Sequence, residues 1–339
     1  MPQVETAPQR RHRLSSRTLL LAAVAACLLF PLVLPGRLAY VNYCWIGLTF
    51  GGLVALIALG YTMVYGIIGL INFAHGDLFM LGAFLAWTIA GWLDLESAGA
   101  LPMLGGIALL LVVVPAFCAC LNWSVDRLVY KPLRNAPKLA PLVSAIGVSF
   151  IFMNIGEFWG GPADLSFPKL IPDRNLLGDS QVEITAKDLM LVVVVVPIMV
   201  GLTILVKRTQ LGRAMRATSQ NPVAARLMGV DVDRVIGATF LIGGALGGVA
   251  SVVYGLYINT IGFQMGYQNG LYAFTAAVLG GIGNIPGAVL GGLVIGLVRS
   301  LGSGYIGEKW SDALIFGILI LILVFRPAGL LGERTQEKV

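Results

Sequence analysis

Three polar side chains interrupt a long, mostly apolar stretch early in the sequence. Asn72, His75 and Asp77 follow Tyr61 and Tyr65 in this stretch. An ionised side chain at the centre of a membrane helix costs about 2–3 kcal/mol, so such residues normally face a bundle interior or water. The spacing of Asn72 and His75 predicts that both share one helix face. Two interpretations stay open: a polar kink that borders a translocation path or a partner subunit, or a cytoplasmic loop between two helices.

A second interruption covers residues 280–287, which are rich in glycine and include Asn284 and Pro286. It ends one short apolar segment and begins another. Two broken segments, one in each half of a chain, are typical of transporters whose path crosses the middle of the membrane. Asn284 is therefore a candidate path residue. A nucleotide site is not expected here, because Pro286 stands where G-x-G-x-x-G needs its third glycine.

The basic stretch from Lys207 to Arg234 contains strong signals for a short helix. Asn221 suits the N-cap, Pro222 suits the first helical position, and Gly229 suits the left-handed residue that ends the helix. The small side chains of Ala224 and Ala225 permit close approach by another protein. The alternative is a capped surface helix in a basic loop.

No pattern in the sequence predicts an enzymatic site. It contains no G-x-x-x-x-G-K-[ST] phosphate loop, no nucleophile–base pair, and no cluster of metal ligands around its two histidines and four cysteines. The chain is therefore expected to be either a passive pore or the membrane half of a machine that other subunits power. We expect no cofactor or metal in this chain, with any ATP bound by partner subunits.

The composition places these features in a membrane. Of the 339 residues, 12% are charged and 57% are apolar, and 43 are glycine; the mean hydropathy is +0.86. Soluble domains carry about 25% charged residues, so a soluble enzyme is excluded. The net charge of +6 is explained by basic cytoplasmic loops, and we expect no nucleic acid partner.

Apolar stretches of spanning length predict an all-α, polytopic helical bundle with 8–10 crossings. They lie near residues 18–35, 44–66, 78–93, 103–122, 142–160, 188–206, 235–258, 271–283, 287–301 and 312–325. Ten crossings with both termini in the cytoplasm place most of the 23 basic residues inside, as the positive-inside rule requires. Residues 1–35 could also be a cleaved signal peptide, but the apolar run continues past Cys27, which favours a first membrane helix.

Two sets of residues resemble transport permeases. Ala224-Ala225-x-x-x-Gly229 resembles the core of the EAA loop of ABC importer permeases, although Val223 replaces the glutamate of that pattern. The segments at 58–77 and 273–288, which begin ALGYTMVYG and AFTAAVLGG, resemble the branched-chain amino acid permease family. The similarity covers about residues 41–334. The EAA loop of such permeases docks in a cleft of the ATP-binding subunit.

The resemblance implies an ABC importer permease in the bacterial inner membrane that works by alternating access and has no ATPase site. It implies two ATP-binding subunits, a second related permease, a periplasmic solute-binding protein and the lipid bilayer as partners. Residues 1–40 are then an added basic segment and helix, 41–334 the permease domain with its coupling loop at 207–234, and 335–339 a cytoplasmic tail. The coupling residues are Asn221, Pro222, Ala224, Ala225 and Gly229; the path residues are Tyr61, Tyr65, Asn72, His75, Asp77 and Asn284.

The expected substrates are branched-chain or similar hydrophobic amino acids. Relatives in the same group carry urea or short amides, which is the alternative substrate class. A self-contained channel for a small neutral solute is the alternative mechanism. The second permease is either a copy of this chain or a related chain.

Overall fold

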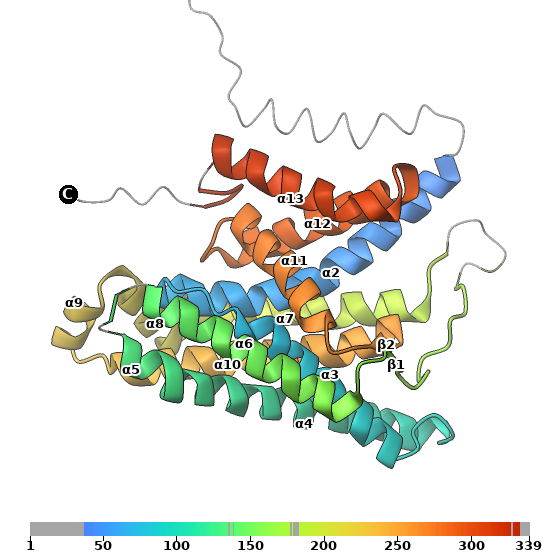
Figure 1. Cartoon of the computed structure of the whole chain (residues 1–339), viewed down its shortest axis with the longest axis horizontal. Helices are drawn as coiled ribbons and strands as arrows, with labels where there is room; N and C mark the ends of the chain where they lie inside the picture. The colour runs from blue at the N-terminus through green and yellow to red at the C-terminus, as the bar shows by residue number, and fades with distance from the viewer. Residues whose placement is uncertain are drawn as a thin grey trace, which may run out of the picture.

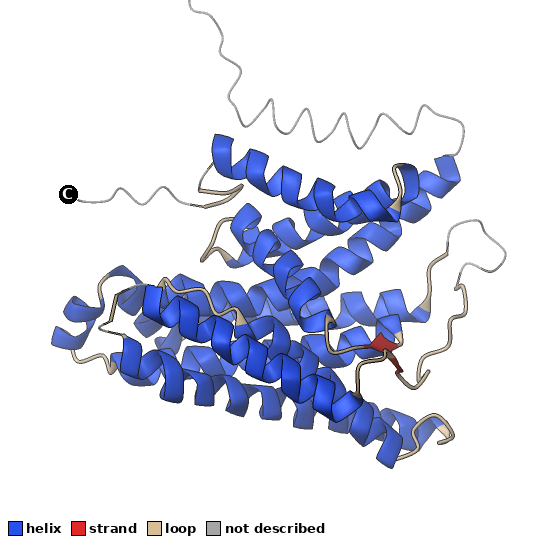
Figure 2. Ribbon diagram, viewed as in Figure 1, coloured by secondary structure: helices blue, strands red, loops and turns tan. Residues whose placement is uncertain are grey.

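The computed structural model describes residues 37–332, apart from 135, 138, 177, 179–182 and 327, as a bundle of helices with one short strand pair (Figures 1 and 2). The elements are α2 (Arg37–Ile68), α3 (Ala74–Trp92), α4 (Ala100–Val125), the π-helical turn η2 (Asp126–Tyr130), α5 (Lys131–Leu133), α6 (Leu139–Gly160), β1 (Leu165–Ser166), α7 (Ala186–Arg208), α8 (Gln210–Gln220), α9 (Pro222–Leu227), α10 (Val232–Ile258), β2 (Thr260–Ile261), α11 (Met265–Gly280), α12 (Ile285–Tyr305) and α13 (Glu308–Phe325). The predicted all-α membrane bundle is confirmed. The expected helix at 18–35, its cleavage and the tail at 335–339 lie outside the described residues.

The nine apolar stretches predicted between residues 44 and 325 each coincide with a helix. Among the described residues, six segments are long and apolar enough to cross a membrane: Ala39–Ile68, Ala100–Leu133, Leu139–Gly160, Ala186–Arg208, Val232–Ile258 and Ile285–Tyr305. The helices α3, α11 and α13 are shorter or carry more charge. Helix α2 begins at Arg37, seven residues before its predicted apolar run. Only the part of a helix inside the hydrocarbon must be apolar, so the helix itself can extend further.

Helices α2 and α10 lie in the core of the bundle, together with α3 and α11, most of whose residues are buried. In the most apolar stretches of α2 and α10, 78% and 72% of the residues are buried inside the chain, compared with 17% for α6 and α7. Apolar side chains on α6 and α7, such as Phe150 and Val193, are exposed on the surface of the chain. The helices α6 and α7 therefore present their apolar surface outward, to lipid or to another subunit.

Glycine faces allow the core helices to approach closely. A Cβ atom on Gly51 of α2 would lie 2.8 Å from Leu293 Cα of α12, and a Cβ atom on Gly292 would lie 2.7 Å from Ala55 Cα. A Cβ atom on Gly248 of α10 would lie 2.5 Å from Pro115 Cα of α4. Small residues let backbones approach in lipid, where van der Waals packing drives helix association. These glycines therefore allow α2 to pack closely on α12, and α10 on α4.

A two-residue strand pair closes the end of the bundle opposite α9 (Figure 1). The strands β1 and β2 are antiparallel, with Leu165 opposite Ile261. Phe167 follows β1, is fully buried, and packs against Gly255 near the end of α10. The sequence did not predict this pair, because strands of two residues carry no periodic signal. It holds the connection between α6 and α7 against the end of α10.

Candidate functional site

Helix α9 begins and ends as its sequence predicts. The side-chain oxygen of Asn221 accepts hydrogen bonds from the N–H groups of Val223 and Ala224, each at 3.0 Å, and Pro222 takes the first helical position. At the other end Gly229 has a φ of +84°, and the N–H of Val230 donates to the carbonyl oxygen of Ala225 at 3.0 Å. These are the N-cap and left-handed C-terminal motifs of stable short helices.

The exposed face of α9 differs from the one that we expected. Ala225 is only 4% exposed, because α9 packs against α8 and α10 on that side. Ala224 is exposed, and three larger apolar side chains are more than half exposed: Val223, Leu227 and Met228. Val223 and Leu227 are four residues apart and therefore lie on one side of the helix. We call Val223, Leu227 and Met228 the α9 contact face.

Ion pairs connect α9 to the neighbouring basic segment at η2 and α5. Asp233, in the first turn of α10, pairs with Lys131 at 3.3 Å, with Arg226 at 3.7 Å and with Arg134. Arg134 also pairs with the buried carboxylate of Asp126 at 2.8 Å. The Arg226–Asp233 pair is exposed and adds little stability. The more buried Arg134 holds η2 and α10 together beside α9.

Asn72 belongs to a buried hydrogen-bond network that joins three parts of the bundle. Its side-chain nitrogen donates to Asn122 Oδ1 of α4 at 3.1 Å, and Asn122 in turn donates to the carbonyl oxygen of Phe240 in α10 at 2.7 Å. Tyr130 of η2 donates from its hydroxyl to Ile71 O at 3.2 Å. Asn72 is 3% exposed, so it does not lie in a solvated loop. It stabilises the break between α2 and α3.

His75 and Asp77 are also buried, but each contacts a different part of the bundle. The His75 ring meets the Tyr61 ring edge-on, with centroids 4.8 Å apart. One carboxylate oxygen of Asp77 accepts from the Ser149 hydroxyl of α6. The prediction that Asn72 and His75 share a helix face is wrong, because α3 begins only at Ala74. Burial of all three polar residues supports the polar kink over the solvated loop.

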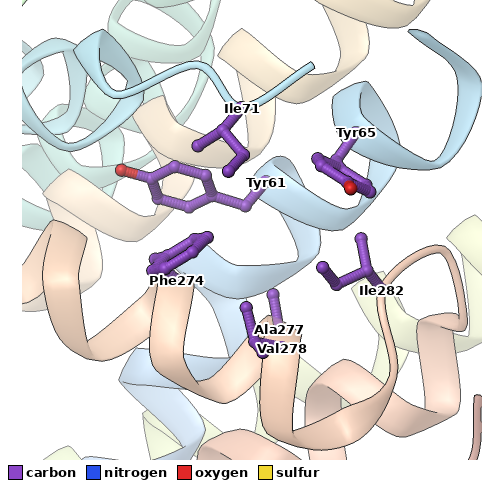
Figure 3. Close-up of a pocket in the computed structure, with 7 residues that line it drawn as sticks. All are labelled: Tyr61, Tyr65, Ile71, Phe274, Ala277, Val278 and Ile282. Carbon is purple, nitrogen blue, oxygen red and sulfur yellow. The ribbon is translucent and has the colours of Figure 1, made fainter. Parts of the chain in front are cut away.

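Tyr61 and Tyr65 line a small pocket between α2 and α11 (Figure 3). The Tyr61 ring lies between Ile71 and Phe274 in this view, and its centroid is 6.5 Å from that of Phe274. The remaining lining residues are Ala277, Val278 and Ile282. The cavity volume is about 10 Å³, which is room for about one water molecule. This aromatic pocket is too small for an organic solute and is closed in this conformation.

Asn284 lies apart from the aromatic pocket and has a structural role at the start of α12. Its side-chain oxygen accepts from the N–H of Gly287 at 3.0 Å, and its side-chain nitrogen donates to Leu331 O at 2.9 Å. The amide therefore caps α12 and holds the segment that follows α13. It does not line the pocket with Tyr61.

The sequence reasoning missed Asn122 and Tyr130. Asn122 is 1% exposed and bonds on both sides of its amide. A lone amide at the end of the apolar run 103–122 is a signal that could have found it, since a buried polar group in a membrane helix requires partners. Within the part of the chain that the structure describes, no group of three His, Cys, Asp or Glu residues is placed to hold a metal ion.

Comparisons with known proteins agree on one family. The model of the family described as "Branched-chain amino acid transport system / permease component" matches residues 43–323. The high-affinity branched-chain amino acid transport system permease protein BraD of Pseudomonas aeruginosa is 43% identical over 299 residues, which cover 86% of this chain and 96% of BraD. LivH of Escherichia coli, with the same description, is 40% identical over 298 residues, again 86% and 96% of the two chains.

A more distant relative comes from the same organism as LivH. LivM of Escherichia coli, also described as a high-affinity branched-chain amino acid transport system permease protein, is 24% identical over 313 residues, which cover 84% of this chain and 69% of LivM. No solved structure matches the chain.

Proposed function

Since the chain belongs to the family of branched-chain amino acid transport permeases, we propose that it forms the membrane path of an ATP-driven importer for branched-chain or similar hydrophobic amino acids. The observation that carries this proposal is 40–43% identity to two such permeases over 96% of their length. The matched residues 43–323 include α9, the aromatic pocket and the buried polar break before α3.

We propose that α9 lies on the cytoplasmic side and contacts an ATP-binding subunit. Its contact face is apolar and exposed, although the surrounding segments are strongly basic. Basic segments favour the cytoplasmic side of a membrane. The caps at Asn221 and Gly229 support a helix that keeps its shape while its partner moves. ATP is bound and hydrolysed by the partner subunits.

The transport path in this proposal passes the aromatic pocket. The closed pocket supports a state in which the path is shut between α2 and α11. Alternating access then requires α2 and α11 to separate. The turn that follows α11 would have to move as well, because a Cβ atom on Gly66 of α2 would lie 3.0 Å from Gly283 Cα in that turn. Asn72, His75 and Asp77 hold the neighbouring break before α3 in place.

The proposed assembly contains two permease chains. The similarity of this chain to both LivH and LivM supports a pair of related permeases. The exposed apolar faces of α6 and α7 support a location of these helices against lipid or the second permease. A solute-binding protein would deliver the amino acid at the end opposite α9.

The test is transport by the reconstituted complex. The chain is co-expressed with the ATP-binding subunits, the second permease and the binding protein of the same system and placed in proteoliposomes. Uptake of labelled leucine, isoleucine and valine that requires ATP and the binding protein is the expected result. Leucine flux through this chain alone without ATP would refute the importer and support a self-contained channel. Uptake of urea but not leucine would refute hydrophobic amino acids as the substrate class and support urea or short amides.

A further inference from the structure

A hollow of about 460 Å³ opens between α6, α11 and α13. Gln264 in its lining closely follows β2, and the strand pair lies at the end of the bundle opposite α9 (Figure 1). This volume falls in the range of small-molecule sites. Its polar lining includes Gln264, Gln268, Tyr272 and Asp312, and its apolar lining includes Met153 and Phe316. A carboxylate and two amides facing hydrocarbon would be unfavourable. The lining therefore suits an aqueous ligand that has both charged and apolar parts.

Asp312 provides a negative charge in this hollow. It lies one turn inside α13, and its Oδ1 accepts a hydrogen bond from the Tyr272 hydroxyl. Tyr272 is itself only 6% exposed, so its hydroxyl fixes the carboxylate from the protein side. Among the residues that the structure describes, no Lys, Arg or His nitrogen lies within 4.0 Å of Asp312. The carboxylate is therefore held in place by Tyr272 and has no positively charged partner in the described part of the chain.

Arg299 provides a positive charge behind the same tyrosine. Its guanidinium carbon lies 5.0 Å from the centre of the Tyr272 ring and 4.3 Å from that of Phe50. Within the described ranges no carboxylate oxygen lies within 4.0 Å of it. Arg299 belongs to α12, which is long and apolar enough to span a membrane. Ionisable residues at such positions usually mark a substrate pathway.

We infer that this hollow receives the free amino acid as a zwitterion before it reaches the aromatic pocket, an inference that rests on the proposed function. Asp312 binds the α-ammonium group, and Tyr272 holds Asp312 in position. Binding of the α-carboxylate is favoured by the positive charge of Arg299 and by hydrogen bonds from the amide N–H groups of Gln264 and Gln268. The branched side chain packs against Met153 and Phe316. A neutral solute such as urea has no ammonium or carboxylate group to pair with these two charges.

The test uses the complete complex in proteoliposomes, with leucine uptake measured at saturating loaded binding protein. We expect Asp312→Asn to lower the maximal uptake rate by at least about tenfold, because a charged hydrogen-bond partner of the ammonium is lost. Asp312→Glu keeps the charge and should retain more uptake than Asp312→Asn. Tyr272→Phe keeps the ring beside Arg299 and should cause a smaller loss. Glu308→Gln, an exposed acid in the same helix and outside the hollow, is the matched control.

Two further measurements separate this inference from other causes. Co-purification of the subunits and ATP hydrolysis with empty binding protein should be unchanged in every variant. Uptake by Asp312→Asn at the wild-type rate would overturn the zwitterion site and leave the importer function intact. Equal loss in Asp312→Asn and Asp312→Glu would also overturn it, because charge would then not matter. A wild-type complex that carries no leucine would instead refute the proposed function itself.

Discussion

Replacing Leu227 by alanine should weaken binding of the ATP-binding subunit without disturbing the permease. Leu227 is 84% exposed at the end of α9, so almost all of its apolar surface is available to a partner. Burying a leucine side chain contributes about 1.5–3 kcal/mol, and alanine removes most of that surface. The expected loss is about 1.5–2.5 kcal/mol, or roughly 10–60-fold in affinity at 1.4 kcal/mol per tenfold.

The chain offers a matched control for this change. Leu101 is 83% exposed in the first turn of α4. The start of α4 lies at the end of the bundle opposite α9 (Figure 1). Leu101→Ala removes the same atoms from an equally exposed position. Neither change should alter thermal stability by more than about 0.5 kcal/mol, as is usual for surface positions.

The assay titrates purified ATP-binding subunit onto detergent-solubilised permease and then measures leucine uptake by the reconstituted complex. Leu227→Ala should shift the binding curve and lower uptake at limiting ATP-binding subunit, whereas Leu101→Ala should match the wild type. Equal affinity and uptake for the two variants would show that the α9 contact face does not bind the ATP-binding subunit. Helix α9 would then be only a connection.

Three more predictions test topology and packing. Cysteine at exposed Arg213 should be labelled from the cytoplasm and cysteine at exposed Arg174 from the outside, and labelling of both from one side would refute the proposed orientation. Asn122→Ala leaves the buried side-chain nitrogen of Asn72 without its acceptor and removes a second bond to the helical carbonyl of Phe240. It should destabilise the fold by about 1–3 kcal/mol in thermal unfolding, and an unchanged midpoint would contradict the network. Gly60→Ala pushes a methyl group into a buried imidazole and should cost about 1–3 kcal/mol, whereas Gly91→Ala, with open space around it, should not destabilise the protein.

The sequence predicted local features of α9 because they depend on neighbouring residues. Asn221, Pro222 and Gly229 specify a start, a first turn and an end within nine residues, and the structure has each of them. The buried side of α9 depends instead on how α8 and α10 pack against it. Ala225 faces that packing, so Ala225→Glu would disturb the permease itself and is a poor test of partner binding.

The polar residues Asn72, His75 and Asp77 likewise combine features that the sequence shows with features that only packing decides. Their unusual types in an apolar stretch were visible in the sequence, but only the structure decides between the two open interpretations, by showing that all three are buried. Their partners were not predictable, since Asn122, Ser149 and Tyr61 are brought to them by three different helices. The role of these residues and of Asn284 in a transport path stays a prediction. The hollow around Asp312 depends on the packing of α6, α11 and α13 and has no local signal.

The central position of α2 has a consequence for how the protein is made. Helix α2 is synthesised first among the described helices, yet in the fold it is covered by α10 and α12. About 220 residues separate the end of α2 from the start of α12, which corresponds to roughly 10–40 s at usual synthesis rates. During that interval the glycine face around Gly51, which later meets α12, is bordered by lipid. Newly inserted α2 therefore lacks its packing partner during this time. Premature termination before α12 would leave the glycine face of α2 unpaired in the membrane, where quality-control proteases could recognise it.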